Sequence, residues 1–231
     1  MEGLQAFALG GIAQSSLLLA GLAVYWVRPS TKVIGGLAGF GAGALVAAVA
    51  FDLIPEAEEM ESWEVALWLL LGALVFVVAD SIVERKYGEG DEAGPLGIVV
   101  GSVVDGVPES IIFGIQIGLG QMLSPAFIGA VFVSNVPQAL APSAALAQSG
   151  WSRGRMAGMW GVVVVSCAVT AWIGFLLGDN LGATGTRAAA LAAGGLLAML
   201  TDSLMPYAVQ KGGAQAGVWT VVGFAASLAA G

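Results

Sequence analysis

Histidine is absent from the sequence, and Cys167 is its only cysteine. Without histidine there is no Ser-His-Asp triad, no histidine-containing zinc site and no side chain that ordinarily changes charge near neutral pH. A single cysteine excludes a disulfide within the chain. The sequence also contains no GxxxxGK[ST] phosphate-binding loop, and its glycine-rich stretches follow apolar helices instead of a βαβ unit. We therefore expect a protein that is not an enzyme and has no organic cofactor.

Charged residues are scarce as well. They make up 10% of the chain, whereas hydrophobic residues make up 58% and the mean hydropathy is +0.88. Soluble domains contain about 25% charged residues. The net charge of −8 also argues against nucleic acid as a partner. This composition predicts an integral membrane protein surrounded by lipid, and the short connections fit a prokaryotic inner or plasma membrane.

Eight apolar segments are long enough to be spans, since a transmembrane helix needs about 20 apolar residues. We expect an all-α bundle that forms a single transmembrane domain over residues 1–231. The first segment has no basic region before it, so we interpret it as a span and not as a signal peptide. The predicted spans lie near residues 4–27, 33–55, 64–84, 95–119, 125–148, 156–178, 187–209 and 215–231.

The basic residues predict the orientation of these spans. Seven of the eight fall in odd-numbered connections, and Arg187 is the exception. Because cytoplasmic loops are rich in Lys and Arg, we expect the odd connections in the cytoplasm and both termini outside. The acidic connection at 56–64 then faces outside, either as a cation-attracting entrance or as a solvated loop. The seven basic residues are Arg28, Lys32, Arg85, Lys86, Arg153, Arg155 and Lys211.

Acidic residues occur within the predicted spans, with no Lys or Arg buried beside them. A charged side chain at the centre of a bilayer costs about 2.5–3.5 kcal/mol on insertion scales, so it is rarely present for packing alone. Such acids are either protonated or neutralised by a cation. A cation pathway or a proton-coupled site accounts for the whole set, which comprises Asp52, Asp80, Asp105, Glu109 and Asp202.

The most informative pair is Asp105 and Glu109, which are four residues apart and share one helix face. Two such carboxylates can hold one divalent ion or share one proton. Pro108 has no N–H to donate to the carbonyl of Val104, so that carbonyl becomes an additional oxygen ligand. A second interpretation is that the proline only kinks the helix and shapes the bundle.

The next predicted span repeats this pattern with neutral side chains. Asn135 and Gln138 are three apart and flank Pro137, which leaves the carbonyl of Val133 without its helical donor. The two amides offer oxygen ligands, or they serve only as interhelical hydrogen-bonding groups. This span would face the Asp105 span across the site.

Three further acids have weaker contexts. Asp52 and Asp202 each lie three or four residues before a proline, which fits either gate carboxylates or acids at the membrane interface. Asp80 lies next to a basic connection, and we interpret it as interfacial. No second motif on a neighbouring span pairs with Asp105, which disfavours an intramembrane aspartyl protease.

These motifs resemble those of the ZIP (Zrt/Irt-like protein) family of divalent metal transporters, which has eight spans, external termini and a metal site on helices 4 and 5. Helix 4 of that family typically reads His-Asn-x-Pro-Glu-Gly. The resemblance rests on four proline positions and the topology. The matching runs are DGVPES at 105–110, SNVPQA at 134–139, FDLIPE at 51–56 and DSLMPY at 202–207.

The chain departs from the family at several positions. The family's helix 4 asparagine corresponds to Gly106, its helix 5 glutamate to Gln138 and its helix 7 glutamate to Ser203. Of the two adjacent metal positions that the resemblance implies, one survives as Asp105, Glu109 and Gln138. The other would need Gly106, Asn135 and Ser203 and is weakened. Family histidines correspond here to Asp52, Asp105, Ser134 and Asp202.

The resemblance implies transport of a divalent ion toward the cytoplasm by alternating access, in a homodimer. Oxygen-only ligands favour harder ions such as Mn²⁺ or Mg²⁺, although carboxylates also bind Zn²⁺ and Fe²⁺. The alternative is a protein of ZIP fold that no longer transports metal and acts as a proton-coupled or organic-solute carrier, or as a regulator. The loss of every histidine and of the helix 5 acid motivates that alternative.

Overall fold

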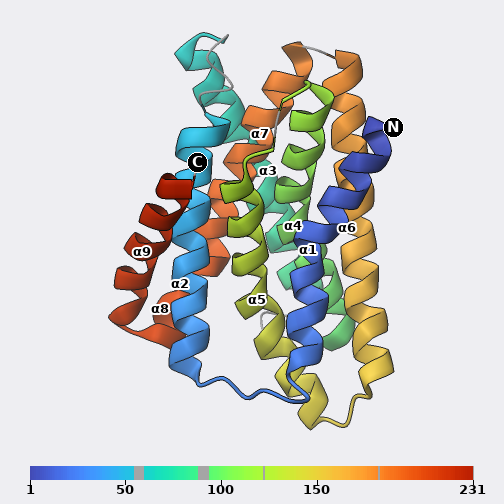
Figure 1. Cartoon of the computed structure of the whole chain (residues 1–231), viewed down its shortest axis with the longest axis vertical. Helices are drawn as coiled ribbons and strands as arrows, with labels where there is room; N and C mark the ends of the chain where they lie inside the picture. Colours follow the sequence, from blue (N-terminus) through green and yellow to red (C-terminus); the bar gives the residue numbers. More distant parts are fainter. Residues whose placement is uncertain (55–59, 88–93, 122, 182, 231) are drawn as a thin grey trace.

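The computed structural model describes residues 1–54, 60–87, 94–121, 123–181 and 183–230, and within these ranges it contains helices and no β-strand. The apolar helices confirm the predicted all-α membrane bundle (Figure 1). The elements are α1 (Glu2–Ala23), α2 (Thr31–Ala48), the π-helical η1 (Val49–Leu53), α3 (Ser62–Tyr87), α4 (Gly94–Gly118), α5 (Pro125–Gln148), α6 (Arg153–Leu181), α7 (Ala183–Met199), the π-helical η4 (Leu200–Leu204), α8 (Met205–Gly212) and α9 (Gln215–Ala230).

Seven of the described helical stretches are long and apolar enough to cross a membrane. Two of them join several elements, because η1 continues α2, and η4 and α8 continue α7. The eighth apolar helix, α9, has only 16 residues, so it is the shortest of the predicted spans. Of the acidic connection expected at 56–64, Glu56, Glu58 and Glu59 lie outside the described residues.

Local sequence signals set where several helices begin and end. Ser30 caps α2 by accepting a hydrogen bond from the backbone N–H of Val33, and Ser124 caps α5 in the same way. Pro125 follows at the first position of α5, where its missing N–H costs no helical bond. Gly213 ends α8 with φ of 59°, a left-handed conformation that glycine adopts readily.

The bundle contains an internal repeat of opposite orientation. α1 descends in Figure 1, whereas α6 ascends from the turn after α5. Exchanging α1–α3 with α6–α9, and α4 with α5, preserves the main helix contacts: α2 packs on α9 as α7 packs on α3, and α5 packs on α1 as α4 packs on α6. The π-helical segments also correspond, since one continues α2 and the other continues α7.

Glycines allow the closest helix pairs. A Cβ on Gly72 of α3 would collide with the carbonyl of Leu191 on α7, and a Cβ on Gly194 would collide with the carbonyl of Leu69. The same reciprocal arrangement occurs between α2 and α9, where Gly43 meets Thr220 and Gly223 meets Phe40. Small residues let helix backbones approach closely in lipid, where packing replaces the hydrophobic effect.

The outer faces of the bundle are apolar, as expected for contact with lipid. Of α3, only Gly72 and Phe76 are buried, whereas Leu70 and Leu74 are 70% and 59% exposed. The basic residues lie elsewhere. None of the eight Lys and Arg side chains is buried, and all but Lys211 are exposed. The connections after α1, α5 and α8, which contain or adjoin five of them, lie at the lower end of Figure 1.

Candidate functional site

A chain of buried hydrogen bonds joins three helices in the interior. Gln14 Nε2 on α1 donates to Glu109 Oε2 on α4 over 2.8 Å. Asn135 Nδ2 on α5 donates to Gln14 Oε1, also over 2.8 Å. The exposed fractions of Gln14, Glu109 and Asn135 are 0%, 1% and 2%, so all three hydrogen-bonded side chains are buried. The other carboxylate oxygen, Glu109 Oε1, is buried without a hydrogen-bond partner among the described residues.

Small residues and a proline hold α4 in place around this chain. Pro108 lies against Gly195 of α7, where an added Cβ would be 3.3 Å from Pro108 Cγ. On its other side, α4 meets α1 and α6 at Gly106. A Cβ there would be 2.6 Å from the sulfur of Cys167 and 3.7 Å from Gln14 Oε1. Gly106 therefore makes room for Cys167 of α6, whereas an added Cβ would only touch Gln14.

Gln14 was not among the residues predicted from the sequence. The sequence prediction followed acids and proline motifs, and α1 contains neither a proline nor a buried acid. The available signal was a glutamine near the middle of a 22-residue apolar helix. An amide at that depth needs hydrogen-bond partners, because lipid provides none.

Asp105 lies one turn before Glu109 and is half-buried. Asp80 on α3 and Asp202 on η4 lie near enough to Asp105 for their charges to act on it. The charge of Asp105 in turn acts on Glu109. Four acids from three parts of the chain thus influence one region, although Asp202 is exposed. Asp80, which we interpreted as interfacial, belongs electrostatically to this group.

The other predicted site residues take separate positions. Ser134 is buried where α5 meets Gly41 of α2, and its hydroxyl donates to the carbonyl of Val131 in its own helix over 2.9 Å. It does not join the Gln14 chain. Gln138 is half-buried, and its Nε2 atom has no hydrogen-bond partner among the described residues. Asp52 is half-buried in η1.

Both acids of the flanking motifs lie in π-helical segments, Asp52 in η1 and Asp202 in η4. A π-helical turn is frequently found at functional sites, where it redirects a side chain within an otherwise regular helix. The sequence placed each acid shortly before a proline but gave no sign of the π-helical geometry. The repeat relates the two segments, although the acids are offset by one residue, since Asp52 is the fourth residue of η1 and Asp202 the third residue of η4.

The chemistry available here is that of oxygen ligands without a compensating charge. Glu109 contacts a neutral amide, and none of the Lys and Arg side chains is buried beside it. Within the described ranges, no group of three or more Asp, Glu or Cys side chains is close enough to hold a metal ion. A cation at Glu109 would therefore meet at most one further carboxylate and would draw its remaining ligands from amide or backbone oxygens.

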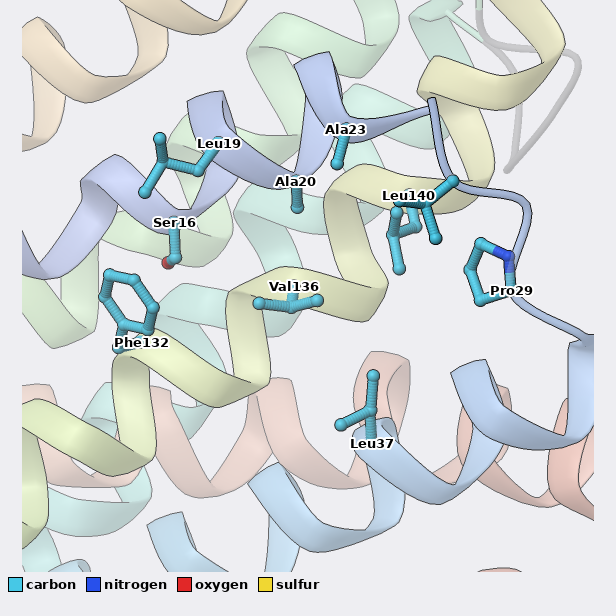
Figure 2. Close-up of a pocket in the computed structure, with 10 residues that line it drawn as sticks. Ser16, Leu19, Ala20, Ala23, Pro29, Leu37, Phe132, Val136 and Leu140 are labelled. Atoms are coloured by element: carbon cyan, nitrogen blue, oxygen red, sulfur yellow. The ribbon is translucent and has the colours of Figure 1, made fainter. Parts of the chain in front are cut away.

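A pocket in the described part of the bundle lies apart from these polar residues. An apolar pocket of about 350 Å³ lies between α1, α5 and α2. In Figure 2, Ser16, Leu19, Ala20 and Ala23 of α1 surround it together with Phe132, Val136 and Leu140 of α5, while Leu37 and Pro29 close the remaining side. No acid lines it.

Comparison with known proteins provides no family assignment. No protein-family model matches the chain, and no curated protein matches it either.

Proposed function

We propose that this protein is a divalent cation transporter of ZIP type that binds its substrate ion at mid-membrane between α4 and α5. The observation that carries the proposal is Glu109, an acid that is 1% exposed and whose carboxylate bonds, among the described residues, only to a neutral amide. Buried charges are usually paired with opposite charges or with metal ions. A substrate cation is the missing partner in this account.

The inverted repeat also supports a cation site at mid-membrane. Transporters built from inverted repeats bind substrate near the midplane, where the two repeats meet. Here Glu109 and Asn135 lie on α4 and α5, the two helices that the repeat exchanges. The resemblance of the four proline motifs to ZIP proteins points to the same pair of helices.

The ligand set favours hard ions. Asp105 and Glu109 would supply carboxylate oxygens, with Asn135 and Gln138 supplying amide oxygens. Pro137 and Pro142 lack the N–H groups that would bond the carbonyls of residues 133 and 138, which adds backbone oxygens on α5. Sets of this type suit Mn²⁺, Mg²⁺ or Ca²⁺ better than Zn²⁺.

The proposed route enters near Asp52 and leaves near Asp202, toward the end of the bundle that bears Arg28, Arg153 and Lys211. This direction follows from the excess of basic residues in cytoplasmic loops. Labelling of an Ala214→Cys variant would report the orientation, since Ala214 is exposed in the turn between α8 and α9 and the native Cys167 is buried.

Uptake of Mn²⁺ into proteoliposomes tests the proposal. Asp105→Asn and Glu109→Gln keep the side-chain shape and remove the charge, so each should reduce uptake by about tenfold or more, as loss of a metal-site group typically does. Glu84→Gln is the matched control, because Glu84 is an exposed acid near the end of α3. Equal uptake by the wild type and the Asp105 and Glu109 variants would contradict the proposal.

The second candidate is a protein of this architecture that carries no metal. It is favoured by the neutral residues at 134–139 and by the intact Gln14 bridge, which partly satisfies Glu109 without an ion. A protonated Glu109 could then serve proton-coupled transport of an organic solute. Proton flux that needs Glu109 but no divalent ion would favour this candidate.

A further inference from the structure

We propose that Gln14 occupies the place of the substrate cation on Glu109 when the site is empty, so that its side-chain amide competes with the ion and sets the affinity. This inference rests on the proposed cation transport. It concerns a residue on α1 that belongs to none of the proline motifs.

The hydrogen bond between Gln14 and Glu109 has a direction that matters for ion binding. Gln14 Nε2 donates to Glu109 Oε2, so the amide hydrogens point at the carboxylate as a cation would. A hydrogen bond to an ionised acceptor is roughly twice as strong as one between neutral groups. Gln14 therefore gives the buried acid part of the stabilisation that a cation would give.

Asn135 prevents the side-chain amide of Gln14 from flipping. Asn135 Nδ2 donates to Gln14 Oε1, which fixes the oxygen toward α5 and the NH₂ group toward α4. Rotation by 180° would point two donors at each other on one side and two acceptors on the other. Asn135 thus keeps Gln14 in the orientation that blocks a cation.

Gln14 and an ion also compete for the same carboxylate. Glu109 Oε2 has two lone pairs, and the Gln14 N–H occupies one of them with its positive end directed at the oxygen. Glu109 Oε1 has no hydrogen-bond partner among the described residues and stays available. An ion that binds through both oxygens would lie beside the positive end of the Gln14 amide, so we expect it to displace the amide from Oε2.

The competition predicts that removing the Gln14 amide increases the affinity for the ion, which a purely structural role would not produce. In Gln14→Met the bond to Glu109 is missing in both the empty and the ion-bound state, whereas the wild type loses it only when the ion binds. Asn135 loses its acceptor in both states of the variant, so that loss cancels. The variant should be less stable when empty and should bind the ion more tightly.

The experiment is a Mn²⁺ titration of the full-length protein in detergent, followed by equilibrium dialysis and by the ion-induced rise in melting temperature. We expect Gln14→Met to lower the Kd for Mn²⁺ by about tenfold, since one charge-assisted hydrogen bond no longer opposes binding. Gln5→Met is the matched control, because Gln5 is exposed on the same helix, and its Kd should equal that of the wild type.

Gln14→Ala also removes Nε2 and carries the same expectation, which covers the case in which the methionine variant does not fold. An unchanged or higher Kd in the folded Gln14 variant, with clear Mn²⁺ binding by the wild type, would overturn this inference alone. A wild type that binds no divalent ion would overturn the proposed function and this inference with it.

Discussion

At the scale of single residues, the interior holds polar groups that an optimised apolar core would not contain. Gln138 illustrates this, because its Nε2 atom is buried without a hydrogen-bond partner among the described residues. An unsatisfied buried donor costs about 1–3 kcal/mol. A buried polar group that costs stability in this way is expected where the side chain binds a ligand.

Gln138→Leu should therefore separate stability from function. The variant removes the buried donor at similar volume, so the melting temperature of the empty protein should rise by a few degrees, about 2–4 °C for each kcal/mol in a chain of this size. The affinity for Mn²⁺ should fall, because the amide oxygen is lost. Gln148→Leu at the exposed end of α5 is the control and should change neither quantity. A less stable variant with unchanged affinity would argue that Gln138 only packs.

The sequence analysis pointed to acids and to the amides beside prolines, but not to the amide on α1. Glu109 and Asn135 were predicted to be site residues, and the structure brings them together, but through Gln14. The sequence could not reveal Gln14, because the contact depends on how α1 packs against α4 and α5. For the same reason the sequence could not show that Ser134 stays outside the hydrogen-bonded chain of Gln14, Glu109 and Asn135. Its hydroxyl bonds within its own helix.

At the scale of helices, glycine positions determine which pairs approach closely. Gly72 and Gly194 place α3 and α7 in backbone contact, and Gly43 and Gly223 do the same for α2 and α9. These pairs are the repeat-related equivalents of each other. The sequence showed abundant glycine at small-xxx-small spacing but not which glycines lie in contact.

Gly72→Ala should accordingly destabilise the bundle. The added Cβ would collide with the carbonyl of Leu191 and approach the backbone of Gly195, and overpacking of this type costs about 1–3 kcal/mol. Gly129→Ala is the control, since no atom lies within 4 Å of its added Cβ.

The control should be neutral or more stable, because alanine is favoured over glycine in a helix by about 0.8–1 kcal/mol. Thermal unfolding in detergent measures both variants. Equal melting temperatures for the two would contradict the described packing of α3 on α7.

At the scale of the whole molecule, the lengths of the apolar segments predicted the all-α membrane bundle. The predicted span 125–148 coincides with α5, because Ser124 and Pro125 mark its start and Gly150 follows its end. The π-helical segments and the inverted repeat were not predictable, since neither depends on composition. Both arise from how the two halves of the bundle pack. The repeat exchanges α4 with α5, the helices that contain Glu109 and Asn135.

The central claim is that the buried carboxylates of α4 bind a divalent cation, and equilibrium dialysis of the purified protein with Mn²⁺ tests it most directly. Carboxylates bind metal in the ionised form, so protons compete with the ion. We predict saturable binding at neutral pH that weakens as the pH falls and is lost in Glu109→Gln. The account would be contradicted by no saturable binding at neutral pH, or by binding that neither acid nor Glu109→Gln alters.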